Sequence, residues 1–103
     1  MDTVQLAKIL KALSHPNRLE LYLEIAKAHE TSFESKKERA RVCLISEVME
    51  RLNIGAPTVS HHLKELANAD LIITERQGKF LVARINKDTI CQVIDVFSNH
   101  CRE

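Results

Sequence analysis

The sequence predicts a mostly α-helical protein with a small antiparallel β-hairpin, and three observations lead to this fold class. Apolar residues recur three and four positions apart along most of the chain, which is the spacing of one face of an α-helix. Two short runs rich in Ile, Leu and Val, residues 71–75 and 80–85, are typical of strands. Between them, Gln77 and Gly78 supply a tight turn, because glycine accepts a positive φ. We therefore expect five helices and a two- or three-stranded antiparallel sheet.

Length and composition bound the class of protein. The chain has 103 residues, which suits one domain over residues 1–103 and favours dimerisation, because so small a domain buries limited surface. Hydrophobic residues make up 45% and charged residues 28%, values normal for a folded globular protein. The formal net charge is only +1. Overall charge therefore does not favour nucleic acid, and any attraction to phosphate must come from local clusters of cations.

Neither a membrane span nor a signal peptide is predicted. No apolar run has the length of a transmembrane helix, and the first residues, MDTVQLAKIL, are amphipathic and charged. We expect a cytoplasmic protein that does not associate with membranes. The three cysteines, Cys43, Cys91 and Cys101, lack Cys-x-x-Cys spacing, so free thiols are expected in a reducing compartment.

The first half of the chain predicts two helices and a loop. Residues 3–13 have helical spacing of apolar residues, and Ser14 and Pro16 are suited to end this helix and begin the next. The second helix is expected to run to about Ala28. We expect its buried face to consist of Leu19, Tyr22, Leu23 and Ala26. Residues 29–41 are polar and highly charged, which predicts a solvated loop.

The second half predicts a short strand followed by a helix, a tight turn and another helix. The apolar run 42–45 is expected to join the sheet, and Ser46 is expected to cap a helix that reaches Leu52. Asn53 can adopt the left-handed conformation that ends a helix, and Gly55 and Pro57 can begin the next helix, which reaches about Asn68. After the hairpin, Asn86 caps a last helix that ends near His100.

Two helices joined by a tight turn and followed by a hairpin form a winged helix-turn-helix, which places its second helix in the DNA major groove. In residues 57–68, Val59, Leu63 and Leu66 share the face expected to dock on the body. The opposite face and its flank carry candidate DNA contacts: Thr58, Ser60, His61 and Lys64.

The chemistry of these side chains assigns their expected roles. Thr58 offers a methyl group to thymine and a hydroxyl to a base or phosphate, Ser60 is adaptable, and His61 can donate to guanine N7. Lys64 is long enough to reach phosphate, which positions the complex without reading sequence. His62 lies nearer the buried face, and we expect a packed, hydrogen-bonded side chain rather than a base contact.

The hairpin tip carries Arg76, Gln77 and Lys79, which suit the DNA backbone or minor groove beside the helix. Glu75 partly offsets their charge.

The chain resembles the ArsR/SmtB family of metal- and stress-responsive repressors. The resemblance rests on ALSHPNRL at the start of the second helix, TVSHHL in the recognition helix and RQG in the wing, at the expected distances. It implies a homodimer built from the first and last helices. It also implies repression by operator binding, relieved when an effector binds.

The effector sites known from this family match the chain only in part. The positions of a thiol-sensing Cys-Val-Cys box fall on Leu44 and Ser46, and Cys43 is one residue away. His100 and Glu103 match the late half of a zinc-sensing site in the last helix, but Asp88 is not followed by an imidazole partner. We therefore assign no metal or cofactor.

Two interpretations of the cysteines remain. Cys43, Cys91 and Cys101 are either small buried apolar residues or a thiol switch, in which oxidation, persulfide or arsenite bridges cysteines and changes the dimer geometry.

The leading interpretation is a homodimeric, sequence-specific DNA-binding regulator that reads an imperfect palindrome. Release by a metal, metalloid or thiol-reactive effector is expected. The alternative is a winged-helix protein-interaction module that does not bind DNA, which the low net charge allows. A thiol enzyme is disfavoured, because the neighbours His100 and Cys101 point in different directions on one helix. The sequence leaves open the effector, the operator and regulated genes, repression versus activation, and the role of residues 29–41.

Overall fold

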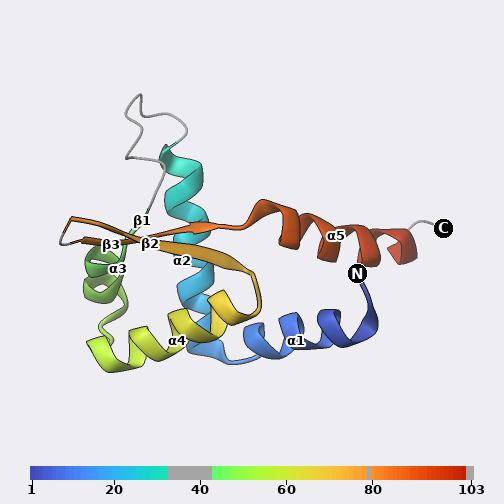
Figure 1. Ribbon diagram of the computed structural model, residues 1–103, viewed down its shortest axis with the longest axis horizontal. Coiled ribbons are helices and arrows are strands. Elements are labelled where there is room, and N and C mark those ends of the chain that lie inside the picture. Colours follow the sequence, from blue (N-terminus) through green and yellow to red (C-terminus); the bar gives the residue numbers. More distant parts are fainter. Residues whose placement is uncertain (33–42, 79, 102–103) are drawn as a thin grey trace.

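The computed structural model describes residues 1–32, 43–78 and 80–101 (Figure 1). The helices are α1 (Thr3–Leu13), α2 (Pro16–Ser32), α3 (Ile45–Leu52), α4 (Ala56–Asn68) and α5 (Lys87–Cys101). The strands are β1 (Cys43–Leu44), β2 (Ile72–Gln77) and β3 (Phe80–Ile85). The described part of the chain thus has the five helices and the antiparallel sheet that the sequence predicts, in the same order.

The sheet joins the hairpin to the segment that precedes α3. Its strand order is β1-β3-β2, and both pairings are antiparallel. In the hairpin Ile72 pairs with Ile85 and Gln77 with Phe80, so the turn falls at Gly78, which has a φ of 67°. Cys43 pairs with Ala83 in β1. The predicted contribution of the apolar run near residue 43 to the wing sheet is therefore confirmed.

Helix α2 is the centre of the core. It contacts α1, α3, α4, β1 and β3, and the side chains of Leu21 and Ile25 are fully buried. Leu66 of α4 and Leu71, just before β2, are also fully buried. The hydrophobic core thus lies where the helix-turn-helix and the sheet meet α2.

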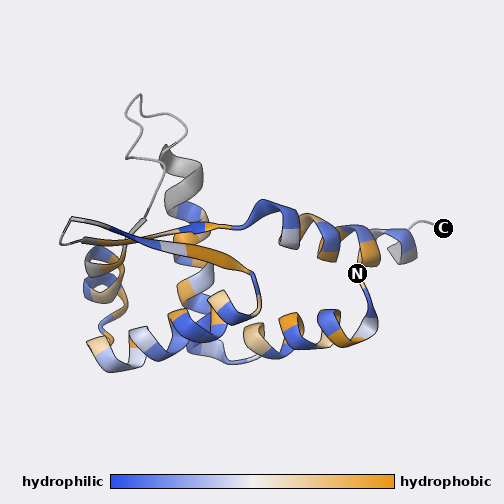
Figure 2. Cartoon of the chain, viewed as in Figure 1, coloured by the Kyte–Doolittle hydropathy of each residue, from blue (hydrophilic) through white to orange (hydrophobic). Residues whose placement is uncertain are grey.

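Helices α1 and α5 project from the same side of the body, away from α3 and the hairpin tip (Figure 1). Both carry exposed apolar side chains, and apolar segments are visible along both helices in Figure 2. Within residues 1–32, 43–78 and 80–101, no helix combines the length and apolar character needed to cross a bilayer.

Some predicted boundaries and faces were wrong. Helix α2 continues to Ser32, so residues 29–32 are helical, while residues 33–41 of the predicted loop lie outside the described residues. Helix α3 begins at Ile45, which places Ser46 inside the helix rather than at its cap.

The buried face of α2 also differs from the prediction. Leu21, Tyr22 and Ile25 are buried, whereas Leu19 is 38% and Leu23 is 49% exposed. The segment LELYLEI carries leucine at every second position, so helical spacing did not distinguish the two faces. Packing of α2 beneath the sheet and α4 selects the face that contains Leu21 and Ile25.

Candidate nucleic-acid interface

The turn between α3 and α4 is built from a positive-φ residue followed by a glycine cap. Asn53 has a φ of 56°, and the Ile54 N–H donates to the Met49 carbonyl at 3.3 Å, which closes α3. Gly55 is the N-cap of α4, with proline in the first turn and no side-chain capping bond. The Val59 N–H donates to the Gly55 carbonyl at 3.1 Å. These residues turn the chain sharply and set the direction of α4.

Helix α4 divides into a buried face and an exposed face, as its sequence predicts. Val59 is 1% exposed and Leu66 is fully buried, and Leu63 is buried beside them. The side chains predicted to contact DNA all lie in exposed positions: Thr58, Ser60, His61 and Lys64. Their exposure makes them available to a groove, and their contact with DNA stays a prediction.

A partly buried ion pair, which the sequence interpretation missed, fixes α3 against α2. Arg51 donates from Nε at 3.0 Å and from Nη2 at 2.8 Å to Oε1 of Glu24. Lys27 contacts the second carboxylate oxygen at 3.4 Å. Burial alone would raise the pKa of Glu24, but the hydrogen bonds and charges of Arg51 and Lys27 outweigh burial and hold that pKa below its ordinary value. The sequence signal for this ion pair was the position of an acidic residue, Glu24, beside the apolar residues Leu21 and Ile25 of the same helix.

His62 packs between two other imidazoles at the base of α4. Its ring centroid lies 4.9 Å from that of His15 and 5.9 Å from that of His61. His62 is 4% exposed, which confirms the predicted packing. The predicted hydrogen bond was wrong: both ring nitrogens are buried without a partner among the described residues. Burial lowers the pKa of His62 first, and the charges of His15, Arg18 and His61 lower it further.

The corner between α1 and α2 is closed by an arginine of the ALSHPNRL motif. Nη1 of Arg18 donates to the Ala12 carbonyl at 3.1 Å, which satisfies a carbonyl in the last turn of α1. The Ser14 hydroxyl donates to the Lys11 carbonyl at 2.8 Å in the same turn. The motif therefore acts as a C-terminal cap for α1.

The hairpin presents Arg76 to solvent near its tip. Glu75 forms an ion pair with Arg84 on the neighbouring strand at 3.2 Å, so its negative charge is partly neutralised by Arg84. The side chains of Gln77 and Lys79 lie outside the described part of the structure. Of the three predicted wing contacts, the structure therefore describes the side chain of Arg76 only.

The candidate effector residues are only partly described. Cys91 on α5 is exposed, so the interpretation of this residue as a buried apolar side chain was wrong for the single subunit. Its position on the flank of the apolar stripe of α5 explains the exposure. The structure does not describe the side chains of the other four candidate effector residues: Cys43, His100, Cys101 and Glu103. Among the residues that the structure describes, no group of three or more His, Cys, Asp or Glu side chains is placed to hold a metal.

Comparison with known proteins identifies the family. A helix-turn-helix domain family matches residues 13–75. The arsenical resistance operon repressor of Staphylococcus xylosus is 30% identical over 101 residues, which cover 95% of this chain and 85% of that protein. The chain belongs to the ArsR family of winged helix-turn-helix transcriptional regulators. The transcriptional repressor SdpR of Bacillus subtilis is 26% identical over 91 residues, which cover 88% of this chain and 87% of SdpR.

Solved structures show the same fold as this ArsR-family chain. An ArsR-like transcriptional regulator from Rhodococcus sp. RHA1 has a TM-score of 0.72 at 19% identity, covering 93% of this chain and 78% of that one. A homodimeric winged helix-turn-helix DNA-binding domain from Mycobacterium bovis has a TM-score of 0.66 at 18% identity, covering 94% and 78% respectively. The family is one of regulators rather than enzymes, as predicted.

Proposed function

We propose that this ArsR-family chain, as one domain over residues 1–103, is a cytoplasmic homodimeric repressor that binds a palindromic operator. The observation that carries the proposal is the division of α4. Val59, Leu63 and Leu66 hold the helix on the core, while Thr58, Ser60, His61 and Lys64 face solvent together. An exposed polar face on a rigidly docked helix is what insertion into a major groove requires.

The side chains divide the work of recognition. His61, with Thr58 and Ser60, is placed to read base edges, and Lys64 is placed to contact phosphate. Arg76, with Gln77 and Lys79 at the wing, contacts the flanking backbone or minor groove. Because the net charge is only +1, these few cations supply the attraction to the duplex.

Dimerisation through α1 and α5 supplies the second recognition helix. Val4 on α1 is 78% exposed, and Ile94 and Phe97 on α5 are 56% and 45% exposed. Large apolar side chains exposed on two adjacent helices favour a protein partner. The Mycobacterium bovis neighbour is described as a homodimer, which supports a second copy as that partner. Two recognition helices then meet successive major grooves, about 34–36 Å apart.

Release from the operator by a metal, metalloid or thiol-reactive effector completes the proposal. The Staphylococcus xylosus relative is named as a repressor of arsenical resistance, which supports effector control of this kind. Cys91 is exposed on α5, where modification would reach the proposed dimer helices. Operator release by arsenite or diamide, compared between wild type and C91S, tests this part separately from DNA binding.

The test of DNA binding is fluorescence anisotropy with the upstream region of the gene at two salt concentrations. We expect affinity to fall steeply with salt. H61A should reduce discrimination between operator and unrelated DNA by about tenfold or more. K64A should weaken both duplexes alike, and K11A, which removes an exposed cation of α1, should change neither. No binding at low salt would reject the repressor and favour a winged-helix protein-interaction module.

A further inference from the structure

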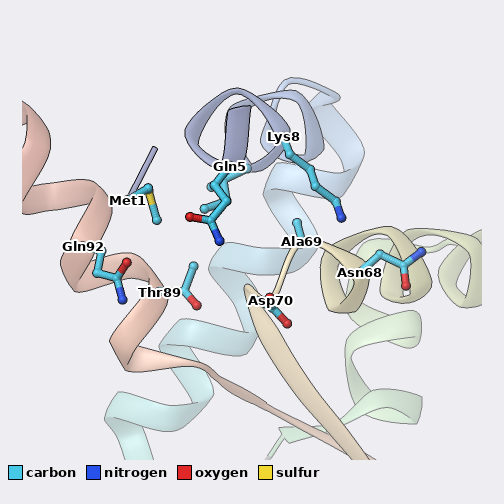
Figure 3. Close-up of a pocket in the computed structure, with 9 residues that line it drawn as sticks. Met1, Gln5, Lys8, Asn68, Ala69, Asp70, Thr89 and Gln92 are labelled. Atoms are coloured by element: carbon cyan, nitrogen blue, oxygen red, sulfur yellow. The ribbon is translucent and has the colours of Figure 1, made fainter. Parts of the chain in front are cut away.

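A polar pocket lies between α1, the turn that follows α4, and the start of α5 (Figure 3). Its volume is about 200 Å³, which suits a small metabolite rather than a larger organic ligand. Buried Ile9 and Ala69 form its apolar part. The pocket is therefore surrounded by the two helices proposed to form the dimer, α1 and α5, and by the end of the proposed recognition helix, α4.

Thr89 is the most buried polar side chain that lines this pocket. It lies in the first turns of α5 and is only 9% exposed. The residue lines the pocket, and its hydroxyl has no hydrogen-bond partner among the described residues. In Figure 3 the amide of Gln5 extends from α1 toward Thr89. A nearly buried hydroxyl without a partner is a site where a ligand hydrogen bond adds affinity.

One exposed residue of each charge sign also lines the pocket. Lys8 projects from α1 beside Ala69, and Asp70 follows α4 (Figure 3). Neither forms an ion pair with the other or with another side chain in residues 1–32, 43–78 and 80–101. Asp70 is held at a φ of 61° by its N–H, which donates to the Ala67 carbonyl at 2.9 Å. Its carboxylate is therefore presented from a fixed turn.

This combination selects the chemical class of the ligand. A simple anion would meet the carboxylate of Asp70, and a simple cation would meet the ammonium of Lys8, each with repulsion. A molecule that carries both a carboxylate and an ammonium group satisfies both side chains. The amides of Gln5 and Gln92 and the Thr89 hydroxyl can donate to or accept from the remaining polar groups.

We propose that this pocket binds a free amino acid or a similar small zwitterion. Lys8 pairs with the carboxylate of the ligand, Asp70 pairs with its ammonium group, and Thr89 adds a hydrogen bond. The site uses none of the cysteines. Its effect on DNA rests on the proposed function: a ligand that bridges α1, α5 and the end of α4 changes the angle of the recognition helix relative to the dimer helices.

The binding test uses the purified full chain without DNA. Each proteinogenic L-amino acid is added at millimolar concentration while backbone amide shifts are followed by NMR. We expect at least one amino acid to shift the amides of Gln5, Asp70 and Thr89 in a saturable manner. Acetate and ethylammonium, which carry one of the two charges each, should bind at least about tenfold more weakly.

Matched variants assign the contacts. K8M and D70N each remove one charged partner and should weaken binding of the responding amino acid by about tenfold or more. Asparagine accepts the positive φ of residue 70, so D70N preserves the turn. T89V keeps the side-chain shape and should weaken binding several-fold. K11M removes an exposed cation of α1 that does not line the pocket and should bind like wild type.

The results separate this site from the DNA-binding proposal. No saturable shift at the pocket with any amino acid, or equal binding by wild type, K8M and D70N, overturns the zwitterion site even where the operator is bound. Binding that depends on Lys8 and Asp70 supports the site even where the chain fails to bind DNA. Where both occur, the responding amino acid should change operator affinity in wild type and K11M by at least several-fold.

Discussion

The two ends of this ArsR-family subunit differ in how completely they bury their apolar side chains. At the helix-turn-helix end, Val48 and Leu66 are fully buried and Val59 is 1% exposed. At the α1–α5 end, Val4 and Phe97 are 78% and 45% exposed. The first end is complete within one chain, whereas the second presents surface that a partner would cover. The packing of α4 is therefore complete within one chain, and in the proposed dimer the α1–α5 end would determine where the second copy of α4 lies.

The largest expected effect is at the complete end. L66A should lower the free energy of unfolding by about 2–5 kcal/mol, because it leaves a cavity among fully buried neighbours. Urea denaturation measures this change. V4A, at the exposed end, should cost less than about 0.5 kcal/mol in the dilute subunit. Equal losses for the two variants would remove the distinction between the ends.

Substitution at the open end should act on assembly instead. F97S should weaken self-association by about tenfold or more, because it removes a large aromatic side chain from the proposed interface. Sedimentation equilibrium measures association, and unfolding of the dilute subunit should change little. S98A alters the neighbouring exposed residue and serves as the control. An unchanged dimer for F97S would place the interface elsewhere.

A smaller effect is expected where α3 is fixed to α2. R51M should destabilise the subunit by about 1–2 kcal/mol, because Oε1 of Glu24 loses both hydrogen bonds from Arg51 while the carboxylate remains largely buried. The exposed pair between Arg84 and Glu75 provides the comparison, and R84M should cost no more than about 1 kcal/mol. Thermal denaturation of both variants at neutral pH tests the order, and a larger loss for R84M would contradict it.

The smallest expected effect is a dependence of stability on pH at the base of α4. Because the pKa of His62 is lowered in the folded state, the unfolded chain binds the proton more readily. Stability should therefore fall as the pH drops below 6.5, the ordinary pKa, toward the lowered folded value. In H62L, whose leucine cannot titrate, the urea midpoint should depend less on pH in this window. Wild-type stability that rises on acidification would contradict the sign.

The lowered pKa of Glu24 acts in a more acidic window. Its stabilising effect is present above the ordinary value of 4.5 and is lost as the pH falls through the lower folded pKa. The contributions of His62 and Glu24 can therefore be separated by titration.

The faces of α4 could be predicted because Val59, Leu63 and Leu66 repeat without interruption and the exposed positions between them are polar. The buried face of α2 could not be predicted, because leucines at alternate positions do not mark a single helical face. Packing of α2 against β3 and α4 determines which face is buried. The same limit applies to the ion pair of Glu24 with Arg51, whose members are 27 residues apart. Local patterns specify a helix and its turn, whereas long-range partners require the folded chain.

The candidate site shows the same division. Exposure of Thr58, Ser60, His61 and Lys64 follows from helical spacing alone. The missing hydrogen bonds of His62 do not, because they depend on which groups of α2 approach the ring. The exposure of Cys91 likewise depends on whether a neighbour covers the flank of α5.

Arg18 lies on the core helix α2 and donates a hydrogen bond to a carbonyl of α1, so it links the core to the α1–α5 end of the subunit. Lysine at this position lacks the planar guanidinium whose Nη1 reaches the Ala12 carbonyl. An R18K subunit would keep its recognition helix and its dimer helices, but the angle between them would no longer be fixed at this corner. In the proposed dimer, two such subunits would span a variable distance on a duplex, and tolerance for altered half-site spacing would rise.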